Sequence, residues 1–310
     1  MKRILLSLAA GVVLAMSPAA HAEKIGVSMS AFDDNFLTVV RNAISADGAK
    51  QKGVSLQFED AQNDVGKQLN QIQNFIAQKV DAIIVNPVDT DATPKMTKLA
   101  SAAGIPLVYV NRMPSDKNLP PKVSFVGSNE KDSGTLEMTE VCRQMGGKGN
   151  ILVMMGDLAN QAARQRTQDI KDVIAKPPCD GIKIVDSRSA NWQRTDAADL
   201  MNNWLSAGLK FDAIVSNNDE MALGAIQSLK AAGKFPKTMI VAGVDATQDA
   251  LASMKSGDLK VTVFQNGAAQ GADAVETALK LARGQQANAT VWIPFELVTP
   301  HNLPAFASRN

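Results

Sequence analysis

The feature that most constrains the fold of this chain is a regular alternation of short apolar runs and longer amphipathic stretches. From residue 24 onward, runs typical of β-strands are followed by stretches with helical periodicity. Such alternation predicts parallel sheets covered on both faces by helices, with right-handed crossovers. The predicted strands lie at residues 24–29, 54–58, 81–85, 106–110, 122–126, 150–155, 182–186, 212–215, 238–241, 260–264 and 291–298.

The alternation is interrupted once, by a polar and proline-rich segment at residues 111–121, and then restarts with the same rhythm. A chain of 310 residues with 45% hydrophobic and 20% charged side chains is long enough for two domains with cores of their own. We therefore expect an α/β protein of two similar lobes rather than one large sheet.

The N-terminus has the three parts of a secretory signal peptide. Lys2 and Arg3 precede an apolar run at residues 4–16, and Ala20-His21-Ala22 has the small-x-small pattern of a cleavage site. The apolar run is shorter than the roughly 20 residues that span a bilayer, which disfavours a membrane anchor. We expect residues 1–22 to be removed and the mature protein to begin at Glu23 in the periplasm.

Composition argues against several classes of function. Without Lys2 and Arg3 the chain has 30 basic and 31 acidic side chains, so charge gives no reason to expect nucleic acid or an anionic membrane as a partner. Of the two histidines, His21 is lost with the signal, so neither a histidine metal site nor a Ser-His-Asp triad is expected. Because the chain also lacks a Walker sequence and a Gly-x-Gly-x-x-Gly fingerprint, we expect no metal and no cofactor.

The two cysteines, Cys142 and Cys179, leave two alternatives open. In an oxidising compartment they can form a disulfide between the end of a predicted helix and the start of a predicted strand. Otherwise they are buried free thiols. No cysteine follows the N-terminal apolar run to receive a lipid, so the exported protein is expected to be soluble.

Polar side chains gather just beyond the carboxyl ends of the predicted strands, where open parallel sheets bind ligands. Carboxylates, amides and arginines match the donors and acceptors of a polyhydroxylated ring, and aromatic rings pack on its C–H face. Turn chemistry also enriches Asn and Asp there, so one strand end is weak evidence. At residues 216–225, Asn218 is the expected ligand contact, and Asp219 is the expected helix cap and a support behind the ligand contacts.

Four segments together resemble the ribose-binding branch of the periplasmic sugar-binding proteins that serve ABC transporters. They read FDDNF at 32–36, NPVDTDA at 86–92, AARQR at 162–166 and NDEMALGA at 218–225. The resemblance covers the whole chain after the signal. It implies a type I periplasmic binding protein with two Rossmann-like lobes and a three-crossing hinge. The N-terminal lobe would comprise residues 23–127 plus 266–296, and the C-terminal lobe residues 128–265 plus 297–310.

The resemblance also implies the ligand contacts. Two rings that would sandwich the sugar match Phe36 and Trp192, although both could be core aromatics. The arginine that forks onto ring hydroxyls matches Arg164; Arg166, two residues on, cannot share its helix face and is expected to be solvated or supporting. The expected ligand-binding set is Phe32, Asp34, Phe36, Asn111, Arg112, Arg164, Trp192, Asn218, Asp245 and Gln265.

Three departures from the family pattern bear on the ligand. A family asparagine appears here as Asp34, a phenylalanine as Leu37, and the carboxylate of an Asp-Arg pair as Asn111. Exchanging carboxylate and amide changes which hydroxyls can donate or accept. Because residues 32–37 resemble inositol- and rhizopine-binding members, a cyclitol is the expected ligand and a hexose the alternative.

The function implied is capture of a sugar or cyclitol between two closing lobes and delivery to an ABC transporter permease, by a monomer and without catalysis. A chemoreceptor is an additional candidate partner. One rival is a sugar-responsive regulator, which needs a DNA-binding head where the signal peptide lies. The other is a carbohydrate-acting enzyme, for which carboxylates scattered in sequence are unspecific evidence.

Overall fold

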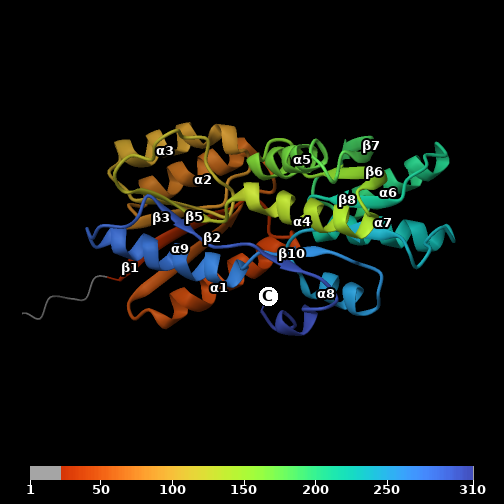
Figure 1. The fold of residues 1–310 in the computed structure, drawn as a ribbon. Helices are drawn as coiled ribbons and strands as arrows, with labels where there is room; N and C mark the ends of the chain where they lie inside the picture. The colour runs from red at the N-terminus through yellow and green to blue at the C-terminus, as the bar shows by residue number, and fades with distance from the viewer. Residues whose placement is uncertain (1–21, 310) are drawn as a thin grey trace, which may run out of the picture.

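The computed structural model describes residues 22–309, which form two α/β lobes lying side by side (Figure 1). The signal peptide predicted at residues 1–22 lies outside the described residues apart from Ala22. Within the described range, no helix combines the length and apolar character needed to cross a bilayer.

The first lobe is built on a six-stranded parallel sheet in the order β11-β5-β4-β3-β1-β2. Helices α1 and α9 cover one face of this sheet, and α2 and α3 cover the other. The strands are β1 Glu23–Met29, β2 Val54–Asp60, β3 Ala82–Val85, β4 Leu107–Val110, β5 Val123–Gly127 and β11 Thr290–Trp292. The helices are α1 Asn35–Lys50, α2 Val65–Ala77, α3 Thr93–Ala102 and α9 Gly267–Ala282, with a 3-10 turn η1 at Thr90–Ala92.

The second lobe repeats this plan on a four-stranded parallel sheet, β7-β6-β8-β9, beside an antiparallel pair, β10 and β12. Single bridges such as Asp245 to Phe264 join β10 to the end of the sheet. The strands are β6 Lys148–Met155, β7 Gly181–Ser189, β8 Ala213–Ser216, β9 Ile240–Ala242, β10 Thr262–Phe264 and β12 Glu296–Val298. The helices are α4 Glu130–Met145, α5 Gln161–Ile174, α6 Arg194–Ser206, α7 Asp219–Ala231 and α8 Gln248–Lys255, with η2 at Leu303–Ala305.

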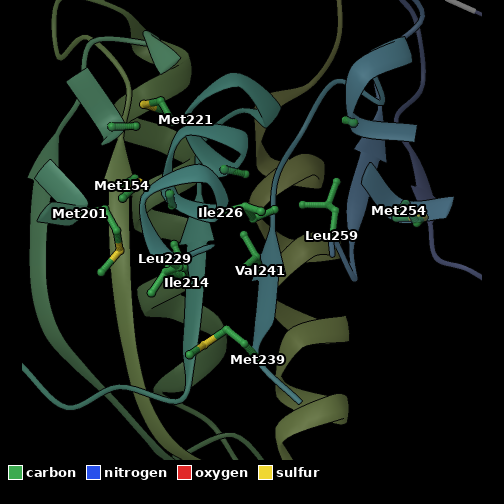
Figure 2. Close-up of a cluster of buried hydrophobic side chains, with 14 of the residues drawn as sticks. Met154, Met201, Ile214, Met221, Ile226, Leu229, Met239, Val241, Met254 and Leu259 are labelled. Carbon is green, nitrogen blue, oxygen red and sulfur yellow. The ribbon is translucent and has the colours of Figure 1, made fainter. Parts of the chain in front are cut away.

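Two apolar layers hold the second sheet. Helices α4 and α5 pack on one face, and α6, α7 and α8 pack on the other around the methionine-rich cluster shown in Figure 2. Met154 and Met201 are fully buried in that cluster. Flexible methionine side chains fill irregular gaps between the helices and the sheet.

Short polar side chains fix where several helices begin. Asp34 accepts a hydrogen bond from the Leu37 backbone N–H at 2.9 Å, and Asn218 accepts one from the Met221 N–H at 3.0 Å. Each satisfies a donor that has no partner within its helix. At the other end of α3, Gly104 has a φ of 72°, the left-handed conformation expected of a residue that ends a helix. These caps place Asp34 and Asn218 at the sheet edges that face the other lobe.

The chain passes between the lobes three times: from β5 to α4, from β10 to α9 and from β11 to β12. The prediction of one strand at residues 291–298 is therefore wrong. β11 pairs with β5 in the first lobe, whereas β12 pairs with β10 in the second. Pro294 stands between them. Proline lacks the N–H that a continuous ladder needs, so the strand breaks where the chain changes lobes.

A disulfide links Cys142 in the last turn of α4 to Cys179 just before β7, with Cα atoms 5.7 Å apart. Of the two alternatives that the sequence left open, the structure has the bonded one. The bridge ties α4 to the edge strand of the second sheet.

Candidate ligand-binding site

A cavity lies between the two lobes, at the carboxyl ends of their strands. Both lobes contribute to its wall, and so does the crossing between β10 and α9. The lining residues are Asp34, Phe36, Leu37, Asn111, Arg112, Glu130, Ala162, Arg166, Trp192, Asn218, Asp245 and Gln265.

Two aromatic rings reach the cavity from opposite lobes. Phe36 comes from the first turn of α1, and Trp192 comes from the turn that precedes α6. The Trp192 Nε1–H donates to Asn160 Oδ1 at 2.8 Å, and the Trp192 carbonyl accepts from Asn218 Nδ2 at 3.2 Å. Hydrogen bonds thus hold both the indole ring and the backbone of Trp192 in this structure.

Gly156, at the end of β6, provides the surface on which Trp192 rests. A Cβ at this position would lie 2.2 Å from Cζ2 of the indole, far inside van der Waals contact. We expect Gly156→Ala to displace the ring and to weaken ligand binding about tenfold, because about 1.4 kcal/mol is the upper end of what an aromatic stacking contact contributes. Calorimetry measures this loss. Gly66→Ala, in the exposed first turn of α2 and away from the cavity, is the control for an added methyl group; equal affinities for the two variants would contradict the assigned role.

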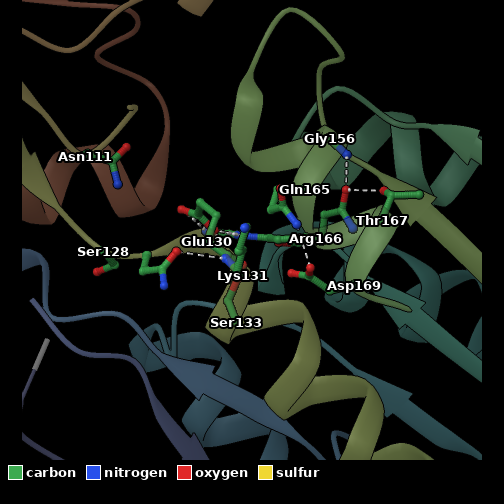
Figure 3. A network of polar contacts seen from close by, with 12 residues as sticks. Asn111, Ser128, Glu130, Lys131, Ser133, Gly156, Gln165, Arg166, Thr167 and Asp169 are labelled. Carbon is green, nitrogen blue, oxygen red and sulfur yellow. Dashed lines mark hydrogen bonds and ion pairs between the residues drawn. The ribbon is translucent and has the colours of Figure 1, made fainter. Parts of the chain in front are cut away.

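The buried pair Arg166 and Glu130 forms the floor of the cavity (Figure 3). Arg166 Nε and Nη2 donate to the two Glu130 oxygens at 2.7 and 3.1 Å, and Nη1 donates to the Asn217 carbonyl at 2.6 Å. Burial alone would lower the pKa of Arg166, but the charge and hydrogen bonds of Glu130 outweigh it and raise that pKa. The guanidinium also lies 5.7 Å from the centre of the Trp192 ring.

Carboxyl groups outnumber guanidinium groups around the cavity. Burial raises the pKa of Asp34, although the Leu37 N–H and the charge of Arg112 act in the opposite direction. Burial raises the pKa of Asp245 well above its ordinary value; the charge of Arg166 opposes this, while neighbouring carboxylates add to it. With Glu130, three carboxyls face two guanidinium groups. A ligand that donates hydrogen bonds or carries positive charge is favoured here.

Asn111 belongs to a chain of buried amides in the first lobe. Its Nδ2 donates to Gln270 Oε1, and its Oδ1 accepts from Asn86 Nδ2, both at 3.2 Å. Gln270 in turn donates to Ser128 Oγ at 3.0 Å. A carboxylate at position 111 would place a hydrogen-bond acceptor next to another acceptor, Gln270 Oε1, and the hydrogen bond between the two residues would be lost. The amide found there fits this network, and it leaves the cavity less acidic than an aspartate would.

Three cavity residues have left-handed backbones that side chains rarely adopt: Asn111 with φ of 67°, Trp192 with 67° and Asp245 with 124°. Such conformations cost roughly 1–3 kcal/mol each and persist only where surrounding contacts enforce them.

The structure brings eight of the ten expected ligand-binding residues to this cavity. The other two lie elsewhere. Phe32 packs beneath Arg41, whose guanidinium carbon is 4.3 Å from the ring centre. Arg164 is about two-fifths exposed and pairs with Asp91 at 3.1 Å.

Helix phase decides which arginine of the AARQR segment faces the cavity. Arg166 lies four residues after Ala162, which also lines the cavity, and four before Ile170 in the core. The expectation that Arg166 is solvated or only supporting is therefore corrected: it is buried in the cavity wall, and Arg164 is outside. The phase of α5 relative to Ile170 was the available signal. Glu130, which the sequence reasoning also missed, gave no local signal.

The expected roles of Asn218 and Asp219 are corrected in one respect, the identity of the helix cap. Asn218 both caps α7 and lines the cavity, whereas Asp219 is not the cap. Its carboxylate is fully buried and accepts hydrogen bonds from Thr262 Oγ1 at 2.7 Å and from the Thr247 N–H at 3.1 Å. It joins α7 to α8 and β10 behind the cavity.

Burial raises the pKa of Asp219 from 3.8 to about 7, despite the hydrogen bonds from Thr262 and Thr247. Folding therefore takes up a proton between these pH values. The resulting stability is fully present below about pH 4 and is lost as pH rises through about 7, at up to about 1.4 kcal/mol per pH unit. We expect Asp219→Asn to flatten this slope in urea titrations at several pH values. An unchanged slope would refute the assignment.

Within residues 22–309, no group of three or more His, Cys, Asp or Glu side chains is arranged to hold a metal ion.

Comparison with known proteins places this geometry in a family. Residues 25–286 match the model of the periplasmic binding protein domain. The chain is 56% identical over the full length of both chains to the "Putative rhizopine-binding protein" of Rhizobium meliloti.

Solved structures agree with this match. A solute-binding protein of an ABC transporter from Bacillus halodurans, solved with bound myo-inositol, is 41% identical with a TM-score of 0.89, covering 95% of this chain and 100% of that one. The Caulobacter myo-inositol binding protein, also solved with myo-inositol, is 28% identical with a TM-score of 0.86, covering 95% and 98%. These similarities extend over both lobes and all three crossings.

Proposed function

The chain belongs to the periplasmic binding protein family, and we propose that it captures a cyclitol of the inositol or rhizopine type between its lobes and delivers it to an ABC transporter permease. The ligand leaves unchanged. The protein acts in the periplasm as a monomer, after removal of residues 1–22, and a chemoreceptor is a further candidate partner.

The observation that supports this proposal best is the composition of the cavity wall. Phe36 and Trp192 approach from opposite lobes and suit the two C–H faces of a saturated ring. Amides, carboxyls and guanidinium groups surround the rim between them, and a ring with a hydroxyl on every carbon needs donors and acceptors all the way round. The excess of carboxyls over guanidinium groups further suits an aminated cyclitol. Relatives described as binding rhizopine and myo-inositol agree with this choice.

Closure follows from the same arrangement. A ligand seated between the rings contacts both lobes and so stabilises the state in which they are together. Hinge closure around ligand is how periplasmic binding proteins switch. A permease that recognises the closed pair of lobes would then distinguish loaded from empty protein.

Thermal unfolding with a panel of candidate ligands tests the proposal. The panel holds myo-inositol, an amino-cyclitol, glucose, galactose and ribose. A ligand at 100 times its Kd adds about 2.7 kcal/mol to the stability of the native state. We expect the largest rise in Tm with the cyclitols; a panel without any shift would refute the proposal. Mass spectrometry of recovered ligand tests the enzyme alternative, which predicts a changed mass.

Asp245→Ala is expected to weaken binding of the best ligand by at least about 1.5–3 kcal/mol, or roughly 10- to 150-fold. The carboxyl is 3% exposed and lies in the cavity wall, so its loss leaves ligand hydroxyls unpaired. Isothermal calorimetry gives the affinity. Asp249→Ala, at an exposed carboxylate on α8, is the control. Unchanged affinity of the Asp245 variant, with folding intact, would remove this residue from the site.

A further inference from the structure

The two lobes also touch each other directly, outside the cavity. In the first lobe, Thr90 donates from its backbone N–H and from Oγ1 to the Ala159 carbonyl, both at 3.1 Å. From the second lobe, the Gln161 backbone N–H and an Arg164 side-chain N–H donate to Thr90 Oγ1 at 3.1 and 3.3 Å. These contacts exist only while the lobes are together.

Asn160 stands in the middle of this contact and is fully buried. Its Nδ2 donates across the lobe boundary to the Val88 carbonyl at 2.8 Å. Its Oδ1 accepts from Trp192 Nε1, also at 2.8 Å. The side chain of Asn160 thus hydrogen-bonds the opposite lobe through its nitrogen and the aromatic ring of the cavity wall through its oxygen.

The partners fix the orientation of this amide. A carbonyl only accepts hydrogen bonds and an indole N–H only donates them, so the amide of Asn160 fits in one direction alone. An aspartate would present an acceptor to the Val88 carbonyl, and an alanine would leave both partners unpaired. Asn160 itself does not line the cavity. Its influence on a ligand therefore passes through Trp192.

Separating the lobes removes the Val88 carbonyl and admits water to the amide. The Asn160 side chain then loses the partner that fixes its nitrogen, and Trp192 loses a rigid acceptor.

We propose that Asn160 is a positioning residue that couples the orientation of Trp192 to contact between the lobes, so that the stacking ring is fixed only in the closed state. This inference rests on the proposed function, because it requires the cavity to be the ligand site. According to this inference, Asn160 contributes to ligand affinity from outside the cavity, by holding Trp192 in place.

A double-mutant cycle tests the coupling. Myo-inositol is the probe, and its Kd is measured for wild type, Asn160→Ala, Trp192→Phe and the double variant. Trp192→Phe keeps a stacking face but lacks the indole N–H. We expect Asn160→Ala to raise the Kd of wild type at least about tenfold. In the Trp192→Phe background, the factor by which Asn160→Ala raises Kd should be smaller by at least about fivefold.

The matched control is Asp91→Ala, which removes the ion pair with Arg164 across the lobes without touching Trp192. Its effect on Kd is expected to be the same in both backgrounds. If Asn160→Ala behaves like this control, with costs in the two backgrounds equal within twofold, the inference is overturned. Asn160→Ser replaces Asn160→Ala in the cycle should the alanine variant fail to fold.

The wild-type measurement separates the two proposals. If wild type binds neither myo-inositol nor any other polyol, the proposed function fails first and takes the inference with it. If wild type binds and the cycle is additive, the function stands and only the role of Asn160 falls.

Discussion

Replacing Arg166 by methionine is expected to lower the free energy of unfolding by about 3–5 kcal/mol, because it leaves the Glu130 carboxylate buried without its cation. Both side chains are about 5% exposed or less, and two hydrogen bonds join them. The same substitution removes the floor of the cavity, so ligand binding should be lost with it. Urea denaturation measures the first effect and calorimetry the second.

Two further variants identify the cause. Arg164→Met lies on the same helix, and its ion pair with Asp91 is exposed, so we expect a loss below about 1 kcal/mol. Adding Glu130→Gln to Arg166→Met should restore part of the stability, since it removes the unpaired charge. If Arg166→Met and Arg164→Met unfold at the same urea concentration, the buried pair does not have the role given to it here.

Removing the disulfide by Cys142→Ala and Cys179→Ala together is expected to reduce the free energy of unfolding by about 4 kcal/mol. The bridge closes a loop with a sequence separation of 37 residues, and a cross-link of this length restricts the unfolded chain by about that amount. The urea midpoint of wild type should fall on adding dithiothreitol, while that of the double variant should not respond.

Because the bridge lies away from the cavity wall, ligand affinity of the folded double variant should match that of wild type. Equal urea midpoints for oxidised wild type and the double variant would show that the bridge does not stabilise the fold.

Much of the fold was predictable because the periodicity of strands and helices depends on residues that are close together in the sequence. The segment at 291–298 was an exception, since its residues form strands in two different sheets. Membership in a sheet depends on the path of the whole chain. Pro294 was the one local sign that a continuous strand could not form.

The part of the site that lies at the carboxyl ends of strands was predictable, because open parallel sheets bind ligands there. That rule and the family resemblance together located Asp34, Asn218 and Asp245, which the structure gathers around one cavity. They failed where spatial partners decide the outcome. Glu130 is distant in sequence from Arg166, its partner, and no pattern in the sequence pairs a residue at a helix start with one on another helix.

Residues 267–292 finish the lobe that residues 23–127 begin. Helix α9 lies against α1, and its Ala274, Val275 and Leu279 belong to the same apolar cluster as Val40 and Ile44. A chain stopped before α9 would expose that cluster to water, and the edge strand β11 would be missing as well. The earliest part of the sequence therefore cannot reach its final form until almost the last part has been made. Nascent or truncated chains should therefore be open to proteases and dependent on chaperones until α9 is in place.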